Sequence, residues 1–371
     1  MPTTNDTRDV CCVSLELSKT SWVLAFAAPL MASVEYLVNP AAAQAAWGVA
    51  LGREHQHAPF DRLEWWSALH ELCLPGEQPL LALVSEGEAR CALALMRHPG
   101  SRQLRSLANW YSFWARPVFA GGGERLLPAL AHDLAHKARR ISLEPMAEPD
   151  AERTAAAFAA AGWTVRAEQT DVNHRVELAG RGFAEYWAAR PGRLRETVRR
   201  KGAKAAVALR IAERFDPADW ADYEAVYAQS WKPVEGSPAF LRRFAEVEGA
   251  AGTLRLGLAH IAGQPVAAQL WTVEHGTAYI HKLAHVEHSK AHSPGTLLSH
   301  ALFAHAIDRD RAQTIDFGTG DDAYKRDWME IVRPMLRLDM HRPLNPRSWP
   351  HLLRNRLKGP GFPLAALHHD G

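Results

Sequence analysis

The chain has 371 residues, of which 47% are hydrophobic and 23% charged, with a formal net charge of +2. This is the composition of an ordinary globular protein that can bury a full core. The charge is too small to indicate a nucleic-acid-binding protein, although 19 histidines would add charge below neutral pH. The length exceeds one typical domain and favours two domains of about 170 residues each.

The cysteines and an early apolar run indicate a protein of the reducing cytoplasm. Cys11, Cys12, Cys73 and Cys91 have neither metal-ligand spacing nor the pattern of a disulfide framework. The apolar run 22–31 is too short to cross a bilayer, and two aspartates upstream spoil the basic start of a signal peptide. We therefore expect no membrane span and interpret this run as an early core segment.

In the first half, apolar residues at helical spacing alternate with short apolar runs typical of strands. Two such runs flank Glu86-Gly87-Glu88 and predict a hairpin. An aromatic-rich segment before the glycine run Gly121-Gly122-Gly123 is interpreted as a further strand. The expected helices are 41–51, 61–72, 124–139 and 150–161, and the expected strands are 80–84, 91–96, 109–114, 141–143, 163–165 and 172–178.

The second half opens with a helical segment, 183–206, that carries many cations. Two interpretations are open, a solvated face of a helix that links domains or an anion-binding surface, and the first is favoured. Asp216 is expected to cap the next helix, and the tail after Pro343 is expected to be irregular. The expected strands are 207–211, 253–261, 266–274, 278–283, 314–317 and 335–340, and the expected helices are 217–230, 237–247 and 296–308.

The most site-like chemistry lies in the stretch 314–328. It begins with a predicted buried strand that contains Asp316, and a buried carboxylate needs a partner such as Lys325 or backbone N–H groups. The glycines that follow allow close approach of a ligand, and two aspartates after them are suited to cap the segment that carries Tyr324. A purely structural interpretation is equally open: the stretch would then be a strand, a glycine turn and a capped helix with a salt bridge.

This stretch, Asp-Phe-Gly-x-Gly-Asp-x-x-Tyr-Lys-x-x-Trp from Asp316 to Trp328, resembles the C-terminal signature of the CelD/BcsL group of GNAT acetyltransferases. That group is named for its association with cellulose biosynthesis and is related to the FemAB-like aminoacyltransferases. The resemblance covers most of the chain but is specific only after about Phe183. It extends through Ser293-Pro294-Gly295, Gly263-Gln264-Pro265 and Ser230-Trp231-Lys232, and more weakly through 60–66.

Both halves share the element order strand, tight loop, helix, strand, which GNAT folds use to hold acyl-CoA. The predicted fold is therefore α/β, with tandem GNAT-like domains that each have a mixed, mostly antiparallel sheet flanked by helices. The predicted division is 1–178 for a degenerate N-terminal domain, 179–345 for the C-terminal acyltransferase domain and 346–371 for the tail. Only the second half keeps a charged continuation after its last strand, so one working site is expected there.

The loop before the helix 296–308 is the expected cofactor site. Ser293 is suited to cap this helix, Pro294 to occupy its first turn, and Gly295 to let a ligand approach closely. The free N–H groups that follow, including that of Thr296, would bind a pyrophosphate, and Lys290 would add charge. The loop lacks the glycine-rich form of ordinary GNAT enzymes, and an ordinary helix start remains the alternative.

GNAT transfer, as the resemblance implies it, is direct attack of a substrate amine on the thioester of acyl-CoA. The protein must take a proton from the ammonium and stabilise the leaving thiolate. We assign Asp316 as base or amine-orienting residue, Tyr324 as thiolate acid, and Lys325 as a stabiliser of oxyanion charge. A buried Asp316–Lys325 ion pair without chemistry is the alternative.

Four further residues, Trp231, His281, Lys282 and Trp328, are expected to bind the acceptor. For Trp231 a place in the core is the favoured alternative. The histidines between 281 and 292 suggest a metal, but strand residues four apart lie about 13 Å apart, so no metal site is expected.

The first hypothesis is a cytoplasmic acyltransferase that uses acetyl-CoA or another acyl-CoA to modify a nitrogen or oxygen atom. Its acceptor would be a small molecule or a glycan-linked group in cellulose, exopolysaccharide or envelope metabolism, with no nucleic-acid partner. The second hypothesis is a FemAB-like enzyme that uses aminoacyl-tRNA, and the third is a catalytically silent binding module. Acyl-CoA binding separates the first hypothesis from the other two.

Overall fold

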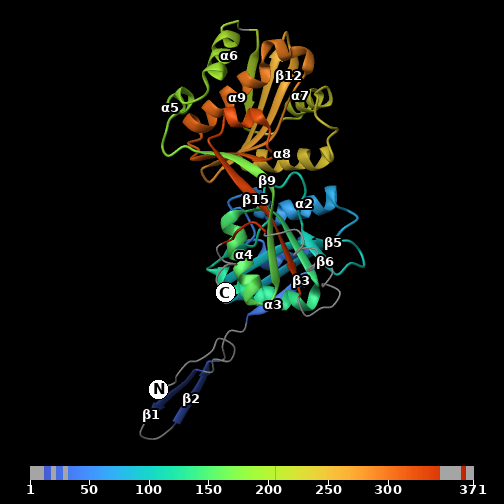
Figure 1. Ribbon diagram of the computed structural model, residues 1–371, viewed down its shortest axis with the longest axis vertical. Helices are drawn as coiled ribbons and strands as arrows, with labels where there is room; N and C mark the ends of the chain where they lie inside the picture. Colours follow the sequence, from blue (N-terminus) through green and yellow to red (C-terminus); the bar gives the residue numbers. More distant parts are fainter. Residues whose placement is uncertain (1–11, 18–21, 28–31, 205, 343–360, 365–371) are drawn as a thin grey trace.

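A computed structural model describes residues 12–17, 22–27, 32–204, 206–342 and 361–364 (Figure 1). Within these residues a 13-stranded sheet runs through the molecule, and β1 (Cys12–Leu17) and β2 (Trp22–Ala27) form a separate two-stranded sheet. The run predicted as an early core segment thus supplies β2. The burial of its side chains lies outside what the structure describes.

The lower part of Figure 1 is the first half of the chain. The predicted hairpin is confirmed as β4 and β5. Helices α3 and α4 cover one face of this part of the sheet, and α2 lies with the other core cluster on the opposite face. The elements are β3 (Ser33–Leu37), α1 (Gln44–Trp47), α2 (Leu63–Cys73), β4 (Gln78–Glu86), β5 (Ala89–Arg97), β6 (Gln103–Ser106), β7 (Val118–Ala120), α3 (Leu127–Lys137), β8 (Arg140–Ala147) and α4 (Glu148–Ala160).

The upper part is the second half. The cap predicted for Asp216 is confirmed, since its carboxylate accepts from the N–H groups of Ala218 and Asp219. The single helix expected over 183–206 is wrong, because Pro191 separates two helices there. The elements are α5 (Phe183–Ala188), α6 (Gly192–Gly202), β10 (Ala208–Ala212), α7 (Pro217–Ala228), α8 (Pro238–Ala251), β11 (Leu254–Ile261), β12 (Gln264–Glu274), β13 (Thr277–His285), α9 (Pro294–Ala304) and β14 (Thr314–Thr319).

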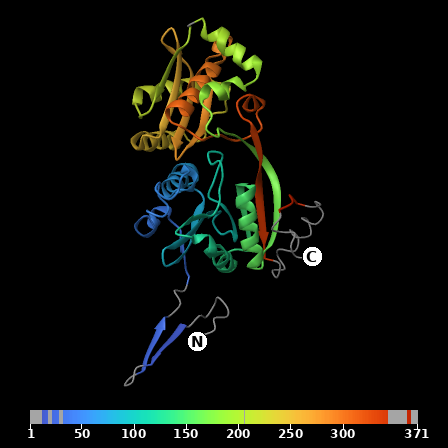
Figure 2. The same ribbon diagram turned by 90° about the vertical axis from the view of Figure 1, so that its left-hand side faces the viewer.

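Two long strands connect the halves. β9 (Thr164–Glu177) joins the runs predicted at 163–165 and 172–178 into one strand, and β15 (Ile331–His341) pairs with it antiparallel along its length (Figure 2). The sheet order is β10-β11-β12-β13-β14-β9-β15-β8-β6-β5-β4-β3, with β7 beside β5. The halves therefore exchange strands, since β9 completes the upper sheet and β15 enters the lower one between β9 and β8.

The predicted boundary at residue 178 falls just after β9, whose last residues already pair with β14. The division into 1–178 and 179–345 therefore stays a prediction about units that share strands. In the predicted tail, residues 361–364 have no helix or strand, yet Leu364 is fully buried and the N–H of Phe362 donates to the carbonyl of Ala167 at 2.8 Å. This piece packs on the lower half.

The strand expected at 109–114 is wrong, because this segment is a loop. The Asn109 side chain accepts from the N–H of Tyr111 at 2.9 Å, and its carbonyl accepts from Ser112 at 3.0 Å, so a local turn replaces the ladder. Phe113 and Trp114 still enter the core, as expected of buried aromatic residues, whereas Trp110 is 67% exposed.

One of the three core clusters contains residues of both halves. Phe60 packs edge-on against Tyr279 at 5.7 Å between ring centroids, and the fully buried Arg62 donates to Glu274 at 2.5 Å. The motif 60–66 therefore packs the lower half onto the upper one. The mixed α/β fold class, with a mostly antiparallel sheet flanked by helices, is confirmed.

Candidate active site

The parallel strands β13 and β14 pair only at their beginnings. Thr277 to Tyr279 pair with Thr314 to Asp316, whereas β13 continues to His285 and β14 to Thr319 without further pairing between them. The strands therefore diverge and leave a gap in the sheet. On this edge the backbone groups of β13 beyond Tyr279 are without a strand partner, as at the exposed edge of a sheet.

Helix α9 begins beside this gap. Pro294 is its first residue and thus lies in the first turn, as predicted, but the cap predicted for Ser293 is wrong. Ser293 has left-handed backbone angles (φ 53°), its side chain makes no capping bond, and its N–H donates to the carbonyl of Lys290 at 3.0 Å. The first N–H groups of a helix have no acceptor within the helix, so those of Gly295 and Thr296 are available.

A cavity of about 530 Å³ lies in front of α9 and one side of the gap. Its volume is in the range of small-molecule sites. It brings together all five predicted cofactor residues with Tyr324, Trp231 and Trp328. We name it the α9 cavity; its lining is Leu194, Trp231, Gln269, Leu283, Ala284, His285, Lys290, Ser293, Pro294, Gly295, Thr296, Ser299, Phe317, Tyr324, Asp327 and Trp328.

The two tryptophans of the α9 cavity differ in exposure. Trp231 is 46% exposed and its ring lies 4.3 Å from that of His285, so it is a wall residue, and the favoured core interpretation is wrong. Trp328 is buried and stacks on Phe303 at 4.8 Å, so only part of it faces the cavity.

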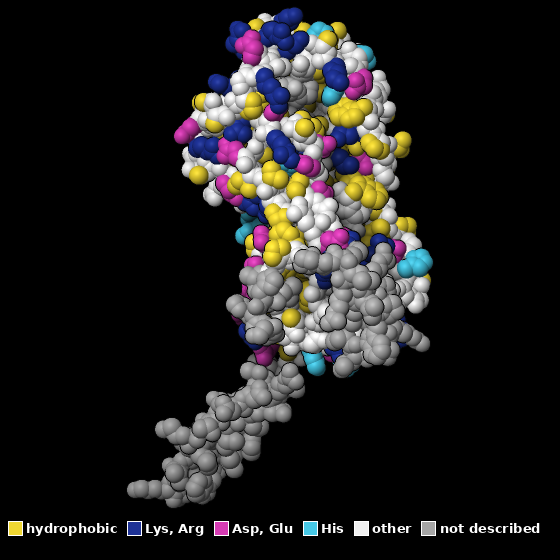
Figure 3. Space-filling view, in the orientation of Figure 1, with side chains coloured by type: hydrophobic (Ala, Val, Ile, Leu, Met, Phe, Trp, Pro, Cys, Tyr) yellow, Lys and Arg dark blue, Asp and Glu magenta, His cyan; other side chains and the backbone are white. Residues whose placement is uncertain are grey.

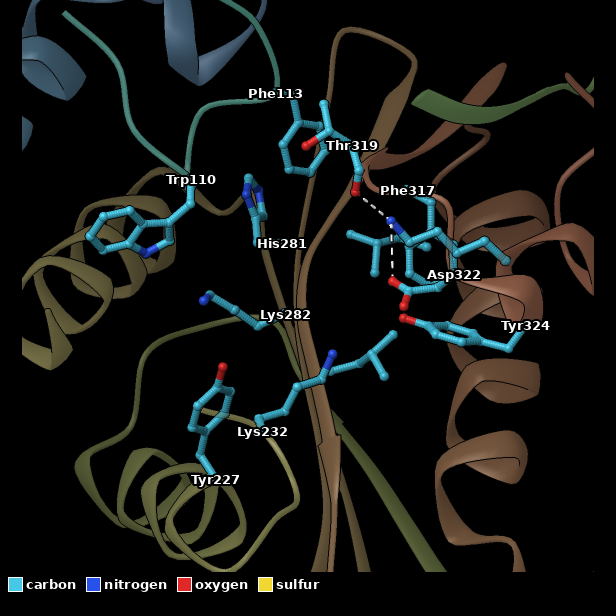
Figure 4. A pocket seen from close by; sticks show the side chains of 14 residues that line it. Trp110, Phe113, Tyr227, Lys232, His281, Lys282, Phe317, Thr319, Asp322 and Tyr324 are labelled. Carbon is cyan, nitrogen blue, oxygen red and sulfur yellow. Dashed lines mark hydrogen bonds and ion pairs between the residues drawn. The ribbon is translucent and has the colours of Figure 1, made fainter. Parts of the chain in front are cut away.

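A second cavity, of about 190 Å³, occupies the gap itself (Figure 4). We name it the gap cavity. Leu283, Phe317 and Tyr324 line both cavities, so the two adjoin. Its lining is Trp110, Phe113, Tyr227, Lys232, Ile280, His281, Lys282, Leu283, Phe317, Gly318, Thr319, Asp322, Tyr324 and Lys325, so the first half contributes Trp110 and Phe113.

One wall of the gap cavity is the turn after β14. Lys325 donates to the carbonyls of Thr319 at 2.5 Å and Gly320 at 3.0 Å, which fixes this turn. In Figure 4 the hydroxyl of Tyr324 lies beside the carboxylate of Asp322. Burial, and then the negative charge of Asp322, raise the pKa of Tyr324, so its hydroxyl is a proton donor at neutral pH.

Asp316 lies outside both cavities. Side chains alternate along β14, so Phe317 lines them while Asp316 faces a separate cavity of about 180 Å³ with Arg175 and Arg333. Its carboxylate accepts from Asn173 at 2.7 Å, from the N–H of Gly318 at 2.8 Å and from Arg333 at 3.3 Å. It shares no cavity with Ser293, and the alternative of an Asp316–Lys325 ion pair is wrong as well, since Lys325 bonds to carbonyls.

His281 and Lys282 line the gap cavity from β13, at the bulge opposite Leu270 and Trp271. Burial lowers the pKa of His281 to about 3, and its Nε2 lies 2.8 Å from the hydroxyl of Thr272, so the ring is neutral. Lys282 pairs with Glu235 at 3.0 Å. Among the residues that the structure describes, no group of three or more His, Cys, Asp or Glu is placed to hold a metal.

The sequence did not single out several cavity residues. Lys232 lies in the Ser230-Trp231-Lys232 motif and Asp322 is one of the two aspartates expected to cap the segment that carries Tyr324, whereas no pattern in the sequence points to Tyr227. Trp110 belongs to the aromatic-rich segment 109–114, which the sequence predicts as a strand and not as part of the site. The signal that could have found Lys232 and Asp322 was their position inside the motifs of the resemblance, close to the assigned residues Trp231 and Tyr324.

The cation-rich segment 183–206 was interpreted either as a solvated helix face or as an anion-binding surface, and its cations differ in their environment. Arg190 is buried and donates to the carbonyl of Trp328 at 3.0 Å, which is a structural role. The cations of α6 are mostly exposed and gather at the upper end of the molecule (Figure 3). Lys201 donates to the carbonyl of Ala291 at 2.5 Å, so α6 reaches the loop before α9.

A family model matches the part of the chain that holds most residues of the two cavities. Residues 191–326 match the model of an acetyltransferase (GNAT) domain, and no curated protein sequence matches the chain at a significant level. The match contains β13 and β14, which line both cavities, and α9, which lines the α9 cavity.

Several solved structures are similar to this chain at low sequence identity. FemX aligns with 78% of this chain and 93% of its own, with 12% identity and a TM-score of 0.55. The C-terminal domain of a putative lysylphosphatidylglycerol synthetase from Agrobacterium fabrum aligns with 79% and 91%, with 13% identity and a TM-score of 0.51. A tandem GNAT protein from the clavulanic acid biosynthesis pathway covers 82% and 98%, with 13% identity and a TM-score of 0.45. The first two likenesses show a common fold.

Within the described residues, none of the helices has the length and apolar character needed to cross a bilayer.

Proposed function

We propose that the chain is an acyl-CoA-dependent acyltransferase that transfers an acyl group, most simply acetyl, to an amine or hydroxyl. The observation that carries this proposal is the gap between β13 and β14, which joins the α9 cavity to the gap cavity beside a free helix start. A donor on one side of the gap and an acceptor on the other would meet where Leu283, Phe317 and Tyr324 line both cavities.

The donor is proposed to lie in the α9 cavity. The N–H groups of Gly295 and Thr296 point out of the helix start, where the helix dipole favours an anion such as pyrophosphate, and Lys290 lies at the rim. The unpaired edge of β13 would bind an extended amide-bearing arm as an added strand binds a sheet. Acyl-CoA, when bound, supplies the activated thioester.

The acid and the base are proposed to come from the turn after β14. Tyr324 lines both cavities and is protonated at neutral pH, so its hydroxyl is placed to give a proton to the leaving sulfur. Asp322 replaces Asp316 as the proposed base, because its carboxylate faces the gap cavity and Asp316 does not. Asp322 would accept the proton that the acceptor ammonium loses, directly or through water.

The wider biological setting rests on the resemblance to the CelD/BcsL group. Within this proposal the enzyme acts in the cytoplasm, on a small-molecule or glycan-linked acceptor of cellulose, exopolysaccharide or envelope metabolism. The FemAB-like use of aminoacyl-tRNA is the second candidate. The exposed cations of α6 favour it, since a basic surface beside the donor cavity suits a nucleic acid as well as a nucleotide phosphate.

The test is calorimetric titration of acetyl-CoA into the wild type and into Gly295→Trp. Residue 295 has room for a side chain, because its Cβ would meet His285 at an ordinary 3.6 Å, and an indole there would fill the α9 cavity. We expect binding by the wild type and none by Gly295→Trp. A matched control is Gly76→Trp, in an exposed turn with nothing within 4 Å of its Cβ, which should bind normally.

Equal acetyl-CoA affinity of the wild type and Gly295→Trp would refute the donor site. A wild type that fails to bind acetyl-CoA but binds a charged tRNA would favour the second candidate. Binding of neither would leave the silent-module hypothesis.

A further inference from the structure

The gap cavity has two chemically different walls (Figure 4). On one side are Asp322 and Tyr324, which the proposed function uses for proton transfer. On the other are the side chains of Lys232 and Lys282, with Tyr227 below them. The two lysines come from different elements, the loop before α8 and strand β13, and both line the gap cavity.

The two lysines differ in how their charge is balanced. Lys282 pairs with Glu235 at 3.0 Å and lies over the ring of Tyr111 at 4.6 Å. Lys232 is half-buried, and among the described residues no carboxylate lies within ion-pair distance of its ammonium. Its Nζ lies over the ring of Trp231, 5.3 Å from the ring centroid.

The remaining charges of the cavity do not neutralise Lys232. Glu235 is already engaged, since it also accepts from the hydroxyl of Tyr111. Lys325 is a third cation of the lining, held by two carbonyls, and lies 3.8 Å from Asp322. Burial is the largest cause that lowers the pKa of Lys282 and of Lys325, and the positive charge of Lys232 also lowers both. Lys232 is thus close enough to repel each of them.

A half-buried cation without a counter-charge is stabilised when a ligand supplies one. Lys232 faces a cavity, so an anion has room to enter. The opposite wall carries the proposed base, which needs an ammonium or amine in front of it. The exposed ring of Trp110 at the rim offers a flat surface against which a sugar or another ring can lie.

We propose, on the basis of the proposed function, that the acceptor is a small amine that also carries an anionic group, a carboxylate or a phosphate. The anionic group binds Lys232, assisted by Lys282, and the amine faces Asp322 and Tyr324. Lys232 is then a specificity-determining residue: it selects acceptors and orients them across the cavity, so that the nitrogen points to the junction with the α9 cavity.

The test compares acceptors that differ only in the anionic group, by calorimetric titration in the absence of any acyl donor. Glucosamine 6-phosphate is paired with glucosamine, and L-lysine with L-lysine amide. We expect the anionic member of at least one pair to bind at least tenfold more tightly. The pair that shows the preference identifies phosphate or carboxylate as the group bound.

Variants then locate the preference. Lys232→Ala should remove it, Lys232→Arg should keep most of it, and Lys137→Ala, which removes the same charge from α3 in the lower half, should leave it unchanged. No preference in the wild type, including no binding by either member of both pairs, overturns the inference. A preference that survives in Lys232→Ala overturns it as well.

Acceptor binding is measured without acetyl-CoA, so the inference and the proposed function fail separately. A protein that binds acetyl-CoA but shows no anion preference refutes only the acceptor class. A protein that shows the preference through Lys232 but binds no acetyl-CoA refutes only the donor.

Discussion

The two strand–loop–helix–strand units of this chain use their glycines in opposite ways. In the lower half, a Cβ on Gly123 would lie 1.7 Å from the carbonyl oxygen of Arg90, and one on Gly121 would lie 2.4 Å from that of Glu88. This loop packs its backbone directly on β5. In the upper half, a Cβ on Gly295 would meet the His285 side chain at 3.6 Å and face the α9 cavity. The loop with more glycines is the one without room for a ligand.

The parallel strand pairs of the two units also differ in the space that they leave for a ligand. β6 and β8 pair in parallel only over three residues, as β13 and β14 do. Beyond these three residues, however, backbone groups of β8 are hydrogen-bonded to other residues of the lower half. The N–H of Glu144 donates to the Ser106 hydroxyl at 2.9 Å, and the Pro145 carbonyl accepts from the N–H of Ala115 at 2.7 Å. The aromatic loop closes the lower gap, while the upper gap remains a cavity.

The largest expected effect comes from adding a methyl group at a glycine of each loop, Gly123 in the lower half and Gly295 in the upper half. Gly123→Ala places a methyl group on a backbone carbonyl that has no freedom to move, so we expect a loss of about 3 kcal/mol or more in the free energy of unfolding. Gly295→Ala should change it by less than about 1 kcal/mol. Urea denaturation of both variants measures this. Equal losses would mean that the two loops are packed alike.

The next effect concerns catalysis. Tyr324→Phe removes the proposed acid and should lower kcat about 100-fold, roughly 2.7 kcal/mol in the barrier, with little change in acetyl-CoA affinity. Tyr36→Phe, which removes a hydroxyl bonded to Asp133 at 2.6 Å in the lower half, is the matched control and should keep full activity. Steady-state rates with an accepted amine decide the point. Full activity of Tyr324→Phe would remove Tyr324 from the mechanism.

Asp316→Asn tests a structural role. The carboxylate pairs with Arg333 away from both cavities, so we expect a loss of about 2 kcal/mol in stability from the weakened buried pair. Asp61→Asn, which weakens the buried pair with Arg116 in the lower half, should behave similarly. Denaturation and acetyl-CoA titration measure the two effects. A folded Asp316→Asn protein with unchanged stability and no turnover would restore Asp316 as a base.

The smallest effect is in the pH dependence. The pKa of His281 falls from 6.5 in the unfolded chain to about 3 in the folded one. Between these values the unfolded chain binds a proton that the folded protein does not, so this group lowers stability by about 1.4 kcal/mol per pH unit below 6.5. His281→Gln should have a shallower loss between pH 6.5 and 5.5, measured by urea denaturation. His98→Gln, on an exposed side chain of the lower half, should follow the wild type.

The local structure could be predicted where hydrophobic periodicity and turn residues agree. The β4–β5 hairpin, the helix capped by Asp216 and the helix that begins at Pro294 all follow from such patterns. The exchange of β9 and β15 could not be predicted, because their pairing is decided by partners more than 150 residues apart in the chain. At 109–114 the turn formed by Asn109 outweighed the strand preference of the aromatic residues.

The sequence predicted many of the residues that line the site, but it did not predict which side of the sheet their side chains face. The motif around Ser293 and the residues Trp231, Tyr324 and Trp328 do line one cavity. Alternation along a strand implies that Asp316 and Phe317 face opposite sides, but the sequence does not say which side holds the site. The sequence also did not predict that one wall of the gap cavity carries a lysine and the other a carboxylate. Lys232 and Asp322 are 90 residues apart in the chain and come to line one cavity only in the folded protein.

The strand exchange has a consequence for synthesis on the ribosome. The lower sheet needs β15, which is the last of the described strands to be made, and its neighbour β9 is finished at residue 177. At roughly 5–20 residues per second, the ~150 residues in between take about 8–30 s to emerge. During that time β8 and β9 each have an open edge inside the future sheet. A nascent chain with such edges is a natural client for chaperones until its final strand closes them.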